Sequence, residues 1–480
     1  MKHKRIMSVL ALTMAASIML SVAACSTTNN ATSGNSDTSS VSVQNVSDNG
    51  ISNYNDGEHA LEVSGKTEEY SNVTISKTGS SSSGDEADFY GDNAAVFATE
   101  KATLTLKNVT VNTDGTHANA VFSYGEGTTV NISDSTITTS GNCSGGLMTT
   151  GGGTMNATNL NIHTTGNSSA AIRSDRGGGT VNVDGGTYKT EGTGSPAVYS
   201  TANITVSNAT LESTASEGVV VEGKNSVTLN NVTLTADHSS LNSDKTDNRN
   251  AVMIYQSMSG DASVGNAEFT MSGGSVTNKK GDVFFINNTT ATVTLENVQI
   301  TNQDKSGLFL RAAAAGWGNT GSNGGKVNLC LKKQTLKGDI AVDSVSKLNM
   351  YLSSGTSYEG AVNADNKGEV YVEIESGSKW VLTGDSYVTS LTCDADAIDL
   401  NGHKLYVNRT EYVSGTASKG TAIEIKAEAS TGGQPDGQPG DPPSGGPGGN
   451  GGKPQGDPPS GDPPSGKPLG DGKEPPAKPE

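Results

Sequence analysis

The chain has 480 residues, with 32 basic and 50 acidic side chains and a formal net charge of −18 at pH 7. This acidic balance argues against binding to nucleic acid or to anionic lipid, and polyanionic sugars would bind only with a bridging cation. The six histidines are scattered, zinc-type ligand spacing is absent, and the four cysteines suggest no disulfide framework.

Residues 1–24 are predicted to be a signal peptide, with a basic start and an apolar stretch over residues 6–20. The stretch ends in Val22-Ala23-Ala24-Cys25, which resembles a bacterial lipobox. In that class the peptide is cut before the cysteine, and the cysteine carries the lipid. We therefore expect lipidation of Cys25 and a tether on the extracellular face of the cell membrane. The alternative is ordinary secretion with a chance cysteine.

Two segments of biased composition flank the body of the chain. Residues 25–56 are rich in Ser, Thr and Asn, which favours a flexible stalk because such a composition cannot bury a core. Residues 428–480 are rich in Pro and Gly and predict a disordered tail. Of the 15 prolines only Pro196 lies outside this tail, so the body keeps its backbone N–H groups for hydrogen bonding.

The body, residues 57–427, is a repeat with a period of 25 or 26 residues, and each copy holds three short alternating segments. Between the second and third segments only Asn, Asp or Gly occurs, as a tight left-handed corner requires. These corner positions are Asn108, Asp134, Asn159, Gly185, Asn208, Asn231, Gly273 and Asn297. The pattern predicts an all-β, right-handed, single-stranded parallel β-helix of about twelve three-strand coils, shorter from about residue 326. Residues 237–249 are an inserted loop.

The first segment of each copy has an inward column and an outward row. The inward column is Val96, Val121, Leu147, Ile172, Val198, Val219, Val252, Val283 and Leu308. The next residue in each copy then points outward: Phe97, Phe122, Met148, Arg173, Tyr199, Val220, Met253, Phe284 and Phe309, with Tyr124 and Asp175 two positions further on. An exposed row of this kind predicts stacking on sugar rings. The alternative is that an inserted segment covers the row, or that it stacks on itself.

Two charged groups are candidate ligand sites. Arg173 and Asp175 point outward on one strand, so the guanidinium could bind a uronate, or the two could form a surface pair. Four acidic residues precede the first full coil and favour calcium, which prefers oxygen ligands; a solvated acidic loop is the alternative. These candidate metal ligands are Asp85, Glu86, Asp88 and Asp92.

Several stretches resemble a β-helix family of clostridia and related bacteria. They are residues 89–96 (FYGDNAAV), 145–153 (GGLMTTGGG), 170–179 (AAIRSDRGGG) and 255–261 (YQSMSGD). The members are described as cell-surface carbohydrate-binding-domain proteins with a fold similar to that of pectate lyases. The resemblance implies a secreted, calcium-containing β-helix that binds plant polysaccharides of the cellulose and pectate type, without established catalysis.

These observations together predict a non-catalytic cell-surface lipoprotein that binds cellulose-type or acidic pectic polysaccharide along one face of the β-helix, with calcium. The predicted binding residues are Phe97, Phe122, Tyr124, Met148, Arg173, Asp175 and Tyr199. The runner-up is a polysaccharide lyase with Arg173 as the base, since that chemistry needs a basic residue and calcium. A third possibility is a structural or adhesive surface stalk that binds protein.

Overall fold

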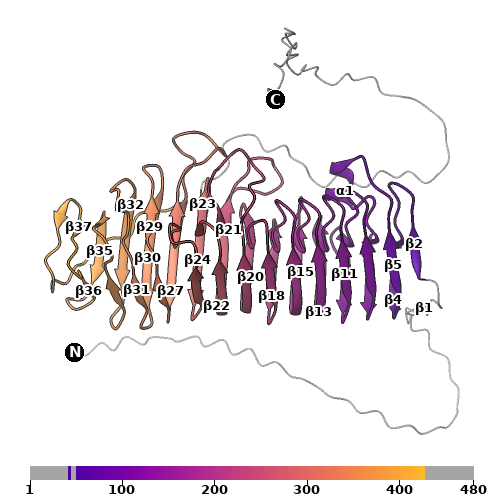
Figure 1. Cartoon of the computed structure of the whole chain (residues 1–480), viewed down its shortest axis with the longest axis horizontal. Helices are drawn as coiled ribbons and strands as arrows, with labels where there is room; N and C mark the ends of the chain where they lie inside the picture. The colour runs from indigo at the N-terminus through magenta and orange to yellow at the C-terminus, as the bar shows by residue number, and fades with distance from the viewer. Residues whose placement is uncertain (1–41, 45–49, 428–480) are drawn as a thin grey trace, which may run out of the picture. The chain divides into compact units, whose positions relative to one another are not determined.

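The computed structural model describes residues 42–44 and 50–427. The predicted signal peptide (1–24), the lipidation site at Cys25, most of the predicted stalk and the predicted tail (428–480) lie outside the described residues. The described chain is a parallel β-helix, so the predicted fold class is confirmed (Figure 1).

The first strands of successive coils form an eleven-stranded parallel sheet, here called the first-strand face. In chain order its strands are β3 (Leu61–Ser64), β6 (Val96–Thr99), β9 (Val121–Tyr124), β12 (Leu147–Thr150), β14 (Ile172–Ser174), β16 (Val198–Ser200), β19 (Val219–Glu222), β21 (Asn250–Tyr255), β23 (Asp282–Asn287), β26 (Leu310–Ala312) and β29 (Ile340–Val342).

The second and third strands form a sheet of twenty strands. Four long strands run through the corner and supply both positions: β13 (Gly153–Thr164), β15 (Gly179–Thr190), β20 (Ser226–Ala236) and β22 (Asn266–Asn278). The second position is otherwise held by β4 (Thr67–Ser71), β7 (Thr103–Lys107), β10 (Thr129–Ser133), β17 (Asn203–Ser207), β24 (Thr290–Glu296), β27 (Lys326–Lys332), β30 (Lys347–Ser353), β32 (Glu369–Ile374) and β35 (Ser390–Cys393). The third is held by β5 (Thr74–Lys77), β8 (Thr110–Thr113), β11 (Thr136–Thr139), β18 (Thr210–Ser213) and β25 (Gln299–Asn302).

The late coils are shorter and end in a hairpin. Their third strands form a separate four-stranded sheet of β28 (Thr335–Lys337), β31 (Ser357–Glu359), β33 (Lys379–Val381) and β36 (Ile398–Asp399). A last sheet joins β34 (Ser386–Val388), β37 (Leu405–Val407) and β38 (Thr410–Glu411), and the β37–β38 pair is antiparallel. This hairpin interrupts the parallel ladder that an open end would otherwise present to another chain.

The β-helix begins earlier than the sequence predicted. β1 (Ser42–Gln44) pairs with β4, and β2 (Ile51–Asn53) pairs with β5. The stalk predicted for residues 25–56 is therefore too long, because its later part adds strands to the sheet. Strands of three residues are too short to show periodicity, which explains why composition alone classed them as linker.

The corner column behaves as predicted. All eight predicted corner residues have positive φ, from 51° at Asn108 and Asp134 to 74° at Gly185. Several corner side chains also form hydrogen bonds with the corner residue of the neighbouring coil. For example, Asn159 Nδ2 donates to Asp134 Oδ1 at 3.0 Å. The left-handed corners let the second and third strands follow each other without a longer connection.

The inward column forms the core, with one change of register. Val96 through Val252 pair in the predicted order and are fully buried, or nearly so, in the continuous core. Val252 then pairs with Phe284, and Phe284 with Leu310. The predicted outward positions of Phe284 and Phe309 are therefore wrong. In β23 the pairing slips by one residue, which exchanges the two faces of the strand, so Phe285 points outward. In β26 the inward residue is Leu310, two positions after the predicted Leu308, and Arg311 is outward, while Phe309 just before the strand packs in the main core.

Candidate functional site

The helix α1 (Gly84–Tyr90) lies over the early part of the outward row. Its C-cap is Gly91, with φ of 86°. A Cβ at this glycine would lie 2.4 Å from Phe97 Cε2 and 3.2 Å from Phe122 Cδ1. The backbone at the end of α1 thus rests directly on the two aromatic rings, a contact that only glycine permits.

Further contacts hold α1 in place. The Thr150 hydroxyl donates to the Phe89 carbonyl at 2.7 Å, and the Arg176 guanidinium lies 3.9 Å from the centroid of the Phe89 ring. The Tyr90 and Tyr124 rings meet edge to face.

The early row is therefore buried. Phe122 and Met148 are fully buried and Phe97 is 8% exposed, in a small apolar cluster separate from the main core, with half-buried Tyr124 against it. The prediction of an exposed stripe is wrong for these coils, and the covering by an inserted segment, which was the alternative, is what the structure has. Phe97, Phe122 and Met148 cannot stack on a sugar while α1 stays in place.

Arg173 and Asp175 form an ion pair within this covered face. Arg173 Nη2 and Nε donate to Asp175 Oδ2 at 2.6 and 3.2 Å, and the Arg176 N–H donates to Asp175 Oδ1 at 3.0 Å. Burial raises the pKa of the Asp175 carboxyl, and the charge of Arg173 opposes that rise. The guanidinium already has a carboxylate partner, so its predicted contact with a uronate would require breaking this pair.

Next to this pair the outward row opens into a cavity of about 220 Å³ over β16, β19 and β21. Its lining includes the aromatic and apolar side chains of Tyr199, Val220, Met253, Tyr255 and Trp317, together with Pro196 and Leu241. The inserted loop 237–249 supplies another wall, and the Gly316 N–H donates to the Lys245 carbonyl at 2.7 Å, which joins the two loops beside the cavity. Among the predicted binding residues, Tyr199 is the one that lines this cavity.

The two tyrosines of the cavity are fixed by a buried carboxylate. Tyr199 Oη donates to Glu222 Oε2 and lies 3.2 Å from Tyr255 Oη. Glu222 Oε1 accepts from the hydroxyl and the backbone N–H of Ser257. Burial, followed by neighbouring negative charge, raises the pKa of both phenols. The rings are thus held as neutral, oriented aromatic surfaces.

A second polar pair, Glu217 and His238, also lines the cavity. The Ser216 hydroxyl donates to Glu217 Oε2 at 2.6 Å, and Glu217 Oε1 lies 3.8 Å from His238 Nδ1. The Asn250 N–H donates to His238 Nδ1 at 3.2 Å, which leaves Nε2 as the nitrogen that can donate from this ring. His238 is 2% exposed, and its Nε2 has no partner within the described chain. A buried donor without a partner costs about 1–3 kcal/mol, but Nε2 itself is shielded from solvent, so a ligand in the cavity would reach it only after a local rearrangement.

A larger hollow of about 340 Å³ lies over β26 and β29, and its lining contains Arg311, Asp339, Asp343, Asp365 and Lys367 but no aromatic side chain. Arg311 Nε donates to Asp282 Oδ2 at 2.6 Å. Without a flat apolar surface it suits a sugar ring less well than the first cavity does.

The acidic segment does not gather its four carboxylates. Asp85 and Glu86 lie exposed in the first turn of α1, and Asp92 Oδ2 accepts from the Ser81 hydroxyl at 3.3 Å. Only Asp88 belongs to a group of three close metal-ligand side chains in the described residues, and its partners are His117 and Cys143. Among the described residues, no three of Asp85, Glu86, Asp88 and Asp92 lie close enough together to share an ion, and calcium binding by this segment stays a prediction.

Sequence reasoning missed Tyr255, Trp317 and His238. Tyr255 could have been predicted from the repeat, because it lies two residues after the outward row, the position that Tyr124 has in its own coil. Trp317 and His238 come from the loops that interrupt the repeat, where no periodicity indicates which side chain returns to the face.

The fold and cavity define this chain as a parallel β-helix with an aromatic pocket on its first-strand face. Comparisons with protein-family models, with curated proteins and with solved structures give no significant match. The resemblance to the clostridial family therefore stays a prediction. In the described part of the chain, no helix has the length and apolar character needed to cross a membrane.

Proposed function

We propose that the protein binds polysaccharide without cleaving it, and that one sugar unit enters the cavity between Tyr199, Tyr255 and Trp317. The observation that carries the proposal is that these three aromatic side chains line one cavity, with the Glu217 and His238 side chains beside them. Aromatic faces suit the apolar faces of a sugar ring, while a few directed polar groups select its hydroxyls.

The charges of the cavity favour a neutral sugar of the cellulose type over a uronate. Glu217 lies in its lining, Glu222 lies behind the two tyrosines, and the whole chain is acidic. A carboxylate on the ligand would be repelled there unless a cation intervened. Pectate-type sugar with calcium remains the second ligand class of the proposal.

Two observations favour binding over catalysis. Glycoside hydrolysis needs two carboxyl groups free to face the scissile bond, whereas Glu222 is occupied by Tyr199 and Ser257. A lyase needs a base, but Arg173 is paired with Asp175, and its pKa is raised above the ordinary value, with the attraction of Asp175 outweighing the effect of burial. With the predicted lipid on Cys25, the protein would act as a cell-surface receptor for sugar.

The test is native electrophoresis of the full chain in gels containing soluble cellulose derivatives or polygalacturonate, each with calcium or a chelator. We expect retardation in the neutral polymer. Trp317→Ala removes a cavity wall and should weaken binding by roughly 10- to 100-fold, from about 1.5–3 kcal/mol of lost apolar contact.

Tyr54→Ala is the matched control, since Tyr54 is 71% exposed and does not line the cavity. Equal retardation of wild type and Trp317→Ala would contradict the proposed site. A cleared zone in the gel would make the protein an enzyme, and unchanged mobility in every polymer would favour a structural stalk.

A further inference from the structure

His117 and Cys143 occupy one corner position in successive coils. Both have left-handed backbone conformations, with φ of 56° and 53°. The His117 N–H donates to the Asn142 carbonyl at 2.9 Å, and the Cys143 N–H donates to the Asn167 carbonyl at 2.8 Å. Because each residue repeats the backbone geometry of the other, their side chains leave neighbouring coils at the same corner.

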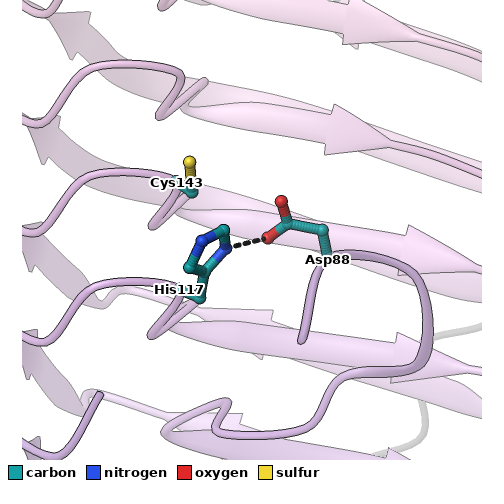
Figure 2. Close-up of side chains that lie close together, drawn as sticks. All are labelled: Asp88, His117 and Cys143. Atoms are coloured by element: carbon teal, nitrogen blue, oxygen red, sulfur yellow. Dashed lines mark hydrogen bonds and ion pairs between the residues drawn. The ribbon is translucent and has the colours of Figure 1, made fainter. Parts of the chain in front are cut away.

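The helix α1 adds a third group at this corner. Asp88 Oδ1 lies 3.1 Å from His117 Nδ1, and Figure 2 shows the three side chains side by side. One ligand atom from each of Asp88, His117 and Cys143 lies within 4.8 Å of the other two. The His117 and Asp88 side chains are 19% and 15% exposed, so the group is sheltered but open to small solutes.

From this geometry we propose that Asp88, His117 and Cys143 form a binding site for a borderline-soft divalent cation of the zinc class. Thiolate, imidazole and carboxylate are the three ligand types that zinc takes in proteins. A tetrahedral ion with bonds of about 2.0–2.3 Å needs ligand atoms roughly 3.5 Å apart. The three ligand atoms now lie within 4.8 Å of one another, so they must approach further on binding, and the ion replaces the present hydrogen bond between Asp88 and His117.

The donor set separates this site from the calcium predicted for the acidic segment. Calcium is a hard cation that takes six to eight oxygen ligands, whereas sulfur and nitrogen supply two of the three donors here. Three protein ligands leave a fourth tetrahedral position for water.

Such an ion would fasten α1 to the β-helix. His117 and Cys143 belong to two coils of the solenoid, and Asp88 belongs to the helix that covers Phe97 and Phe122. A cation bound only by the folded arrangement stabilises it by mass action, by about 2.7 kcal/mol at a hundred times its dissociation constant. Ion binding at this site would therefore set how stably α1 covers Phe97 and Phe122, independently of the sugar cavity.

The test uses the full chain titrated with Co²⁺, which reports thiolate ligation by a charge-transfer absorption band, followed by displacement with Zn²⁺. We expect one Co²⁺ per chain with a thiolate band that Zn²⁺ removes and Ca²⁺ does not. Cys143→Ser should lose the band, and Asp88→Asn should weaken binding at least tenfold.

Two features of the chain supply controls. Serine is tolerated at this corner, since Ser168 occupies it in the next coil with φ of 54°, so Cys143→Ser should fold. Cys330→Ser removes another half-buried thiol far along the chain and should keep the band. Zn²⁺ should raise the unfolding temperature of wild type and Cys330→Ser but not of Cys143→Ser. Absence of the band in wild type, its persistence in Cys143→Ser, or competition by Ca²⁺ would overturn the proposal.

Discussion

Replacing Phe122 by alanine separates the structural and the ligand-binding interpretations of the outward row. The ring is fully buried, lies edge to face with Phe97 at a centroid distance of 5.9 Å, and touches the backbone at Gly91. Truncating a buried Phe costs about 3–5 kcal/mol, because the surroundings close the cavity only in part. For a folded region of roughly 380 residues, at ~2.1 cal/mol/K per residue, this lowers the unfolding temperature by about 4–6 °C.

The loss of stability in Phe122→Ala should appear first in α1. The helix packs on this ring but contributes few contacts of its own to the main core, so its amides should exchange with solvent before those of the strands. Urea unfolding and hydrogen exchange of the full chain measure the two effects, and Phe122→Leu, which refills most of the volume, should lose far less. Phe122→Ala with unchanged stability but abolished sugar binding would refute the reasoning, since it would make the ring a ligand contact.

Three further changes test other parts of the fold. Arg173→Ala leaves the Asp175 carboxylate buried without its partner and should cost about 3–5 kcal/mol in urea unfolding; a cost below 1 kcal/mol would show that water reaches the pair. Asn159→Ala puts a Cβ without a polar side chain at φ of 53° and should cost about 1–2 kcal/mol, while Asn159→Gly should cost less. The pKa of Asp304 is lowered to about 2, first by the Ser306 hydroxyl and then by backbone N–H donors. Its contribution to stability is therefore present above about pH 4 and is lost as the pH falls toward 2. Asp304→Asn should flatten that part of the pH–stability curve, and an unchanged acid limb would contradict the assignment.

The sequence predicted the coil geometry well because that geometry is periodic. Corner residues such as Asn108 and Asp134 need a left-handed backbone in every coil, and the inward residues alternate with the outward ones in every strand. The prediction failed where the period is interrupted. The repeat before β23 differs in length, and a slip of one residue placed Phe284 outside when it belongs to the core.

The candidate sites were harder to predict for a related reason. The alternation of residues along a strand predicts which side chains point outward. Whether water reaches those side chains depends on segments inserted elsewhere in the chain. The contact of Gly91 with Phe97 and the return of Trp317 over Tyr255 are tertiary facts with no periodic signature. By the same argument the repeat itself can reveal a site that ordinary motif spacing hides. His117 and Cys143 are one coil apart in sequence, so in a β-helix their separation of one period is the spacing that makes two side chains neighbours.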